Sequence, residues 1–174
     1  MLIWFNGPSR DKLINSLPRQ TLEIGCNYIE KIRPVDHVCA FDIDVAKNIK
    51  CKPDVKYHTR PQATQPGWNI INDTITDGGN SGVLACYVAS QLQKQPIYII
   101  GCDWGLTDDS SDDYIYQSGP KRKYTNNIKR SVARILNGTE VWIVNNRKPD
   151  VPFNIISTDD FLYKINNNTQ GRTL

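Results

Sequence analysis

The sequence lacks the features that place a chain in a membrane or in an oxidising compartment. No apolar run approaches the ~18 residues that a membrane-spanning helix needs. The start of the chain, MLIWFNGPS, has neither the basic residues nor the apolar length of a secretion signal. The five cysteines are an odd number without C-x-x-C spacing, which argues against a disulfide framework and against a zinc site. We therefore expect a cytoplasmic protein with reduced thiols and no transmembrane span.

The sequence also has little excess of charge of either sign. The formal net charge is +3, and charged residues make up 22% of the chain. There is no strong nucleic-acid signal, although residues 121–123 are a short basic segment. A length of 174 residues, of which 39% are hydrophobic, is enough for one domain with a sizeable core.

Short apolar runs separated by turn residues predict strands that alternate with helices. The expected strands are 2–5, 21–24, 36–41, 56–58, 68–71, 97–100, 140–144 and 154–156, and the expected helices are 10–16, 45–50, 83–92, 121–136 and one that begins near 158. Runs such as 2–5 and 97–100 contain no charge, which is typical of internal strands of a parallel sheet. The predicted fold class is α/β, with a Rossmann-like, mostly parallel sheet and helices on both faces. We expect a single nucleotide-binding domain over residues 1–165 and a polar C-terminal tail over 166–174.

Residues 78–105 are the segment around which the rest of the chain is organised. A Gly-Gly-Asn-Ser-Gly turn leads into a helix that is apolar nearly all round, and a strand follows that ends in Gly101-Cys102-Asp103. A helix of this kind is buried. In an open α/β sheet, a helix entry and a strand end such as these can both face the ligand crevice.

Polar or glycine-containing stretches follow four of the expected strands, and one glycine-rich turn adds to them. They are Asn6-Gly7-Pro8-Ser9, Gly25-Cys26-Asn27, Asp42-Ile43-Asp44, Gly101-Cys102-Asp103 and the turn at 78–82. Parallel strand ends meet along one edge of a sheet, and a helix N-terminus favours anions. Gly7 and Gly79 would let the backbone approach a phosphate or ribose closely. We interpret the set as a nucleotide-sized crevice, although each stretch alone also fits an ordinary turn or helix cap.

These stretches resemble a known family. Residues 3–9, IWFNGPS, resemble the GNGPS opening of the small bacterial sialyltransferases that decorate lipooligosaccharide. Cys26-Asn27 resembles their CN pair, and residues 80–85 followed by 97–104 are similar to their SGV…A…A…EIYL.GIDF block. The same pattern occurs in the related archaeal-type 6-hydroxymethylpterin pyrophosphokinases. The similarity extends from the first strand to the helix expected at 121–136.

The resemblance implies a Rossmann-like domain that binds a nucleotide-linked donor, which is CMP-sialic acid in the sialyltransferases. The residues carried over as nucleotide-binding are Asn6, Gly7, Ser9, Asn27, Asn80, Ser81 and Gly82, with Tyr114, Tyr116 and Tyr124 as candidates for the lid tyrosines that grip the donor phosphate. Asp103 would lie at the floor of the crevice. Asp103 and Asp42 are the candidate catalytic bases.

Two departures from the family bear on activity. The family's general-base histidine after the lid has no counterpart here, since residues 119–123 read GPKRK. Asp42 and Asp44 stand where the family has an asparagine after the third strand. A positioned base contributes roughly 10²–10⁴-fold to a rate, so we expect slow hydrolysis, or binding without turnover, rather than efficient sialyl transfer. The two histidines, His37 and His58, are interpreted as structural.

Three functions remain as alternatives. The first, which makes the protein an enzyme, is a glycosyltransferase-like transferase that uses a CMP-type nucleotide or nucleotide sugar as donor. The second is a metal-dependent pyrophosphoryl transferase or nucleotide hydrolase, with magnesium held by Asp42 and Asp44. The third is a non-catalytic nucleotide-binding module, for example a phage sensor. The acceptor, the nucleotide base and the oligomeric state are not specified by the sequence.

Overall fold

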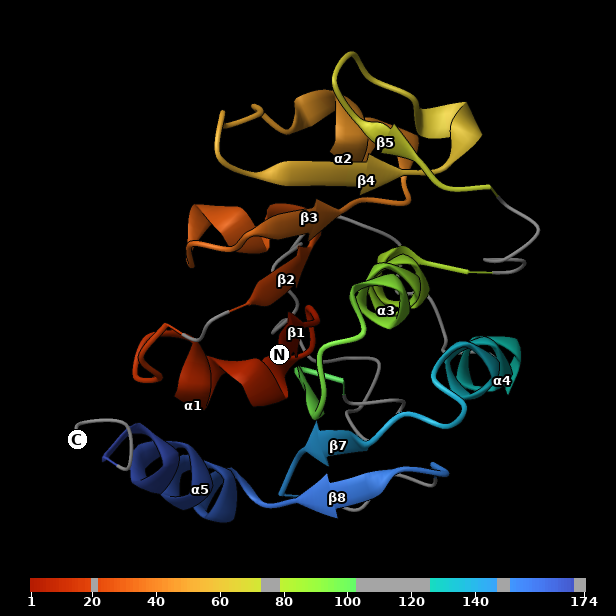
Figure 1. Cartoon of the computed structure of the whole chain (residues 1–174). Helices are drawn as coiled ribbons and strands as arrows, with labels where there is room; N and C mark the ends of the chain where they lie inside the picture. The colour runs from red at the N-terminus through yellow and green to blue at the C-terminus, as the bar shows by residue number, and fades with distance from the viewer. Residues whose placement is uncertain (20–21, 73–78, 103–125, 147–150, 171–174) are drawn as a thin grey trace.

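The computed structural model describes residues 1–19, 22–72, 79–102, 126–146 and 151–170. Eight strands form one sheet in the order β5-β4-β3-β2-β1-β6-β7-β8, and every pairing is parallel (Figure 1). The strands are β1 (Leu2–Trp4), β2 (Glu23–Cys26), β3 (His37–Cys39), β4 (Lys56–Thr59), β5 (Asn69–Ile70), β6 (Ile97–Ile100), β7 (Val141–Val144) and β8 (Asn154–Ile156). The predicted α/β class with a parallel sheet is confirmed, and β1 and β6 are internal strands as expected.

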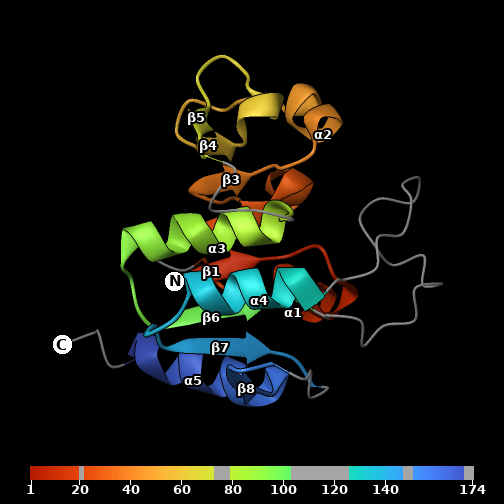
Figure 2. The same ribbon diagram turned by 90° about the vertical axis from the view of Figure 1, so that its right-hand side faces the viewer.

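Helices cover both faces of the sheet (Figures 1 and 2). The helices are η1 (Pro8–Arg10), α1 (Asp11–Ile14), η2 (Asn27–Lys31), α2 (Ile43–Asn48), η3 (Pro61–Ala63), α3 (Ser81–Leu92), α4 (Asn126–Ile135) and α5 (Thr158–Gln170). One apolar cluster joins α3 and α4 to the sheet, and a second joins α1, η2, α2 and α5 to the opposite face. Alternate residues of each strand enter one cluster or the other, because successive side chains of a strand point to opposite faces.

The connections place a topological switch point between β1 and β6. From β1 the chain builds the sheet outward in one direction through β2, β3, β4 and β5. It then returns across the sheet through α3 to β6, which pairs with β1 on its other side. In open α/β sheets, ligands bind outside the carboxyl ends of the strands at such a point.

Several element boundaries differ from those expected. The strand expected at 21–24 is β2 at Glu23–Cys26, so Gly25 and Cys26 belong to the strand and Asn27 is the first residue after it. The helix expected at 45–50 is α2, which begins at Ile43, so Asp42 occupies its N-cap position and Asp44 lies in its first turn. The helix expected at 121–136 is α4, and residues 121–125 lie outside the described part of the chain. The last helix, α5, continues to Gln170, so residues 166–170 are helical rather than part of a tail. Packing of Phe161 and Ile165 stabilises α5 beyond what its polar C-terminal composition suggests.

The central helix α3 is buried, as its composition predicts. Its residues Val83–Cys86 are fully enclosed between the sheet and α4. Gly82 allows α3 to approach the end of β1 closely: a Cβ at this position would lie 2.6 Å from the ring of Phe5. Gly82 therefore has a packing role that the sequence interpretation did not assign to it.

Candidate functional site

The loop that follows β1 is fixed against the end of β6. The Gly7 amide donates to the carbonyl oxygen of Gly101 at 2.9 Å. Arg10, which is buried, donates from Nη1 to the carbonyl oxygens of Asn6 and Gly7, the latter at 3.0 Å. Both backbone groups of Gly7 are thus engaged within the protein. The loop is a preformed element of the switch point between β1 and β6.

The side chain of Asn6, on this loop, carries an unsatisfied oxygen. Its Oδ1 is buried, and no donor in the described part of the chain reaches it. Leaving a buried polar atom unpaired costs about 1–3 kcal/mol, so such atoms are few in native proteins and call for an explanation. Ser9 lies on the same loop, in η1, and its hydroxyl oxygen is also buried. A ligand that donates a hydrogen bond at this edge would satisfy Asn6.

Asn27, directly after β2, has an unusual backbone and a fixed amide. Its φ is +56°, a left-handed conformation that asparagine tolerates better than most residues. Its Oδ1 accepts a 2.6 Å hydrogen bond from the Ser81 hydroxyl. The Ser81 oxygen in turn accepts from the Phe41 amide at 3.0 Å. These two hydrogen bonds tie the ends of β2 and β3 to the start of α3, and the first of them orients the Asn27 amide so that its Nδ2 faces away from Ser81.

The N-terminus of α3 completes this edge. Asn80 is the N-cap residue, and its Oδ1 accepts from the Val83 amide at 3.0 Å. No acidic residue lies in the first turn of α3. The positive end of the helix dipole is therefore not offset by a side chain of the helix itself, and this end of α3 favours an anion.

The two aspartates after β3 lie farther along the same edge of the sheet. Asp42 is half-buried and Asp44 is exposed on α2. In the described ranges, no group of three or more His, Cys, Asp or Glu side chains is placed to hold a metal ion. Asp42 and Asp44 would thus need further ligands to form a magnesium site of the kind expected above.

Several candidates lie outside the described residues. They are Asp103, Tyr114, Tyr116 and Tyr124, and Gly78 of the glycine-rich turn. Among the described candidates, Asn27 contacts Ser81 directly. Asn6 and Gly7 lie on the loop after β1, which is bonded to the end of β6 at Gly101.

Two arginines and one phenylalanine at this edge were missed by the sequence interpretation. Arg10 holds the loop after β1, as described above. Arg60, directly after β4, donates from Nε to the Phe41 carbonyl oxygen at 2.9 Å, and its guanidinium lies 4.3 Å from the centre of the Phe41 ring. The one available signal was position, since Arg60 follows a strand end just as Asn27 follows β2.

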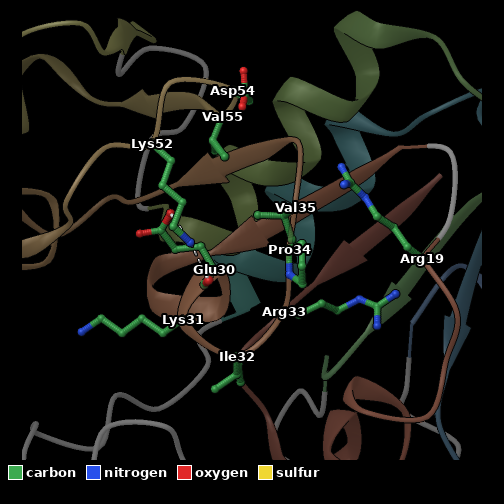
Figure 3. Close-up of a pocket in the computed structure, with 10 residues that line it drawn as sticks. All are labelled: Arg19, Glu30, Lys31, Ile32, Arg33, Pro34, Val35, Lys52, Asp54 and Val55. Atoms are coloured by element: carbon green, nitrogen blue, oxygen red, sulfur yellow. Dashed lines mark hydrogen bonds and ion pairs between the residues drawn. The ribbon is translucent and has the colours of Figure 1, made fainter.

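A shallow groove of about 340 Å³ lies at the opposite edge of the sheet, near the amino ends of β3 and β4 (Figure 3). Glu30, Lys52 and Asp54 are among its lining residues. The buried Glu30 carboxylate accepts from the Tyr57 hydroxyl at 2.8 Å and lies 3.9 Å from Lys52 Nζ. Burial, with Glu30 beside the hydroxyl, raises the pKa of Tyr57 to about 12. The main acid of this groove is thus already paired, and none of the residues expected to bind a nucleotide lines it.

The two histidines form a buried pair across β3 and β4. Nδ1 of His37 lies 2.9 Å from Nε2 of His58. The ring centroids are 5.1 Å apart and the ring planes differ by 15°. The two rings face each other edge to edge. The distance between their centroids is about what one obtains by adding the radius of each ring to the distance between the two facing nitrogens. The other nitrogen of His58, Nδ1, is buried and has no partner among the described residues.

The histidine pair should make the protein sensitive to acid. Burial, followed by the charges of His37 and Lys56, lowers the pKa of His58 to about 4, and burial also lowers the pKa of His37. In the unfolded chain a histidine titrates at ~6.5. Between pH 6.5 and 4 the unfolded state therefore binds more protons than the native state, and the free energy of unfolding decreases as the pH is lowered. His58 alone should lower the free energy of unfolding by about 2 kcal/mol between pH 8 and pH 5.

Urea denaturation of wild type and His58→Gln at pH 8, 6 and 5 measures this effect. Glutamine keeps a hydrogen-bonding group near His37 but does not titrate. The pH dependence should therefore be shallower in the variant. An identical loss of stability with falling pH in both proteins would show that His58 does not couple folding to protons.

Comparison with known proteins gives no relative for this chain: no family model, no curated protein and no solved structure matches it. Within the ranges that the structure describes, none of the helices has the length and apolar character to cross a membrane. The carboxyl edge of the sheet, where the polar residues described above lie, is therefore the basis for a proposed function.

Proposed function

We propose that the chain binds a nucleotide or nucleotide sugar of the CMP type at the carboxyl edge of its sheet, in the manner of a glycosyltransferase donor site. The observation that carries this proposal is that two asparagines, Asn6 and Asn27, follow the neighbouring strands β1 and β2 and that each has an unusual local structure. Asn6 has a buried oxygen without a donor. Asn27 is held in a left-handed conformation, and strained residues of this kind cluster at functional sites.

The fixed amide of Asn27 gives the proposed site a defined polarity. Ser81 occupies Oδ1, so the group left for a ligand is the Nδ2 donor. The start of α3, which favours anions, is linked to the same amide through Ser81. Asn6, in contrast, offers an acceptor. A nucleotide matches this arrangement, because it has phosphate oxygens as acceptors and ribose hydroxyls or an exocyclic amine as donors.

Replacing Asn27 with aspartate should weaken CMP binding by about tenfold or more. Aspartate retains an oxygen to accept from Ser81 and also tolerates the left-handed backbone. It replaces the Nδ2 donor with a negative charge, and a hydrogen bond to a charged group is worth about 1.5–3 kcal/mol. A ligand at 100 times its Kd stabilises the native state by about 2.7 kcal/mol. The thermal shift produced by CMP in wild type should therefore shrink strongly in Asn27→Asp.

The screen uses CMP, UMP, AMP and CMP-sialic acid, each with and without magnesium. Asn166→Asp is the matched control, because it makes the same charge change on the exposed side of α5, on the other face of the sheet. This control should retain the wild-type shift. Absence of any shift with all four ligands at millimolar concentration, or an equal shift in Asn27→Asp, would overturn the proposed function.

A further inference from the structure

Arg60 is held in one orientation by two contacts to a single residue. Its Nε donates to the Phe41 carbonyl oxygen at 2.9 Å. Its guanidinium also lies over the Phe41 ring, 4.3 Å from the ring centre. The stacked ring and the hydrogen bond together restrict the rotation of a long, half-buried side chain. Much of the conformational entropy that a free arginine would lose on binding a ligand is therefore already lost in folding.

The two contacts leave the outer part of the guanidinium available. Both use Nε and the planar face, whereas the terminal Nη1 and Nη2 groups have no carboxylate or carbonyl partner in the described part of the chain. By comparison, Arg33 uses all its nitrogens on Glu23 and backbone carbonyls. A planar pair of N–H donors with a positive charge matches a carboxylate or phosphate.

Phe41 also connects Arg60 to the proposed site. The Phe41 amide binds Ser81, the first residue of α3, and its carbonyl oxygen binds Arg60. The positive end of α3 and the Arg60 cation are thus attached to the same residue, at the same edge of the sheet. Two positive groups that are both bonded to Phe41 favour a negatively charged ligand group at this edge.

We infer that Arg60 is an anion-recognition residue that binds a phosphate or carboxylate group of the ligand through its terminal Nη groups. The identity of the ligand rests on the proposed function, because a nucleotide supplies phosphate and an acidic sugar supplies carboxylate. The anion site itself can be tested without any nucleotide.

The test follows the Nε–Hε NMR signal of Arg60, identified by its loss in Arg60→Gln, as anions are added at constant ionic strength. The probes are inorganic pyrophosphate and malonate. Wild type should show a saturable shift with at least one of them. Saturation with pyrophosphate alone identifies phosphate as the recognised group, and saturation with malonate alone identifies carboxylate; both results support the inference.

The same titrations followed at the Phe41 amide compare the variants. Arg60→Gln should raise the half-saturation concentration by about tenfold or more, as expected for a lost charge-assisted bond. Arg130→Gln, which removes the same charge from an exposed position of α4, should leave it unchanged. No saturable shift in wild type, or equal binding in Arg60→Gln, would overturn the inference even if CMP binds. Anion binding that depends on Arg60 in a protein that does not bind CMP would refute the nucleotide proposal alone.

Discussion

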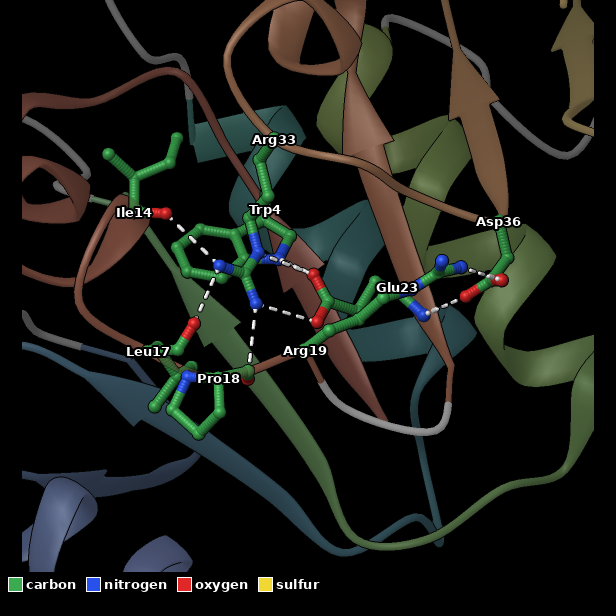
Figure 4. Close-up of polar contacts among 8 residues, drawn as sticks. All are labelled: Trp4, Ile14, Leu17, Pro18, Arg19, Glu23, Arg33 and Asp36. Atoms are coloured by element: carbon green, nitrogen blue, oxygen red, sulfur yellow. Dashed lines mark hydrogen bonds and ion pairs between the residues drawn. The ribbon is translucent and has the colours of Figure 1, made fainter.

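Replacing Glu23 with alanine should lower the free energy of unfolding by about 3–5 kcal/mol, the cost of leaving a buried charge without its partner. The Glu23 side chain is fully buried and accepts from Arg33 Nε at 2.6 Å and Nη2 at 2.7 Å (Figure 4). It also accepts from the Trp4 indole at 2.8 Å. The substitution leaves the buried Arg33 guanidinium with backbone carbonyls only, and it leaves the indole N–H without its acceptor.

Urea denaturation at pH 7 measures this loss. Arg19→Gln is the matched control, because Arg19 forms a 2.5 Å ion pair with Asp36 but has 56% of its side chain exposed. Exposed pairs contribute about 0–1 kcal/mol, so the control should be almost as stable as wild type. If Glu23→Ala is destabilised no more than Arg19→Gln, the buried Glu23–Arg33 pair does not make the large contribution to stability that is expected here.

Replacing Gly101 with alanine should destabilise the protein by about 2–5 kcal/mol. The residue has a φ of +76°, where an L-residue is strained by about 1–2 kcal/mol. A Cβ would also lie 2.6 Å from the carbonyl oxygen of Phe5 and 3.1 Å from that of Gly7. Both are backbone atoms that cannot rotate away, and overpacking of this kind costs a further ~1–3 kcal/mol. Because the clash lies at the switch point, CMP binding should be lost as well.

Gly138→Ala separates the two causes. Gly138 has the same φ of +76°, but a Cβ there would meet nothing within 4 Å. This control should lose only the stability that the strained backbone costs, about 1–2 kcal/mol, and should keep its affinity for CMP. Equal destabilisation of the two variants in urea denaturation would mean that the close approach of β1 and β6 at Gly101 has no energetic consequence.

The sheet and its central helix could be predicted from sequence because local composition determines them. Runs such as Leu2–Trp4 and Ile97–Ile100 are apolar without interruption, which only an internal parallel strand explains well. The helix at α3 was recognisable because hardly any residue of it suits water. The end of α5 was not predicted, since packing of its first turns overrides the weak helix preference of its last residues.

The contacts that shape the candidate site could be predicted only in part. Asn27 and Ser81 were both selected, but their direct hydrogen bond joins residues 54 positions apart. Arg60 was missed because its orientation is set by Phe41, which follows a different strand and is part of no recognisable motif. Likewise, nothing local in the sequence pairs His37 with His58. Such contacts depend on strand order and register, which a single sequence does not specify.

The most direct test of the account is to map CMP binding by NMR on the ¹⁵N-labelled protein. Saturable shifts should concentrate in the amides of Asn6, Asn27 and Ser81, at the carboxyl edge of the sheet. The amides of Lys31 and Lys52, which line the groove at the opposite edge, should not move. Shifts confined to that groove, or no saturable shift anywhere in the protein, would contradict the claim that this chain binds a nucleotide at the switch point of its sheet.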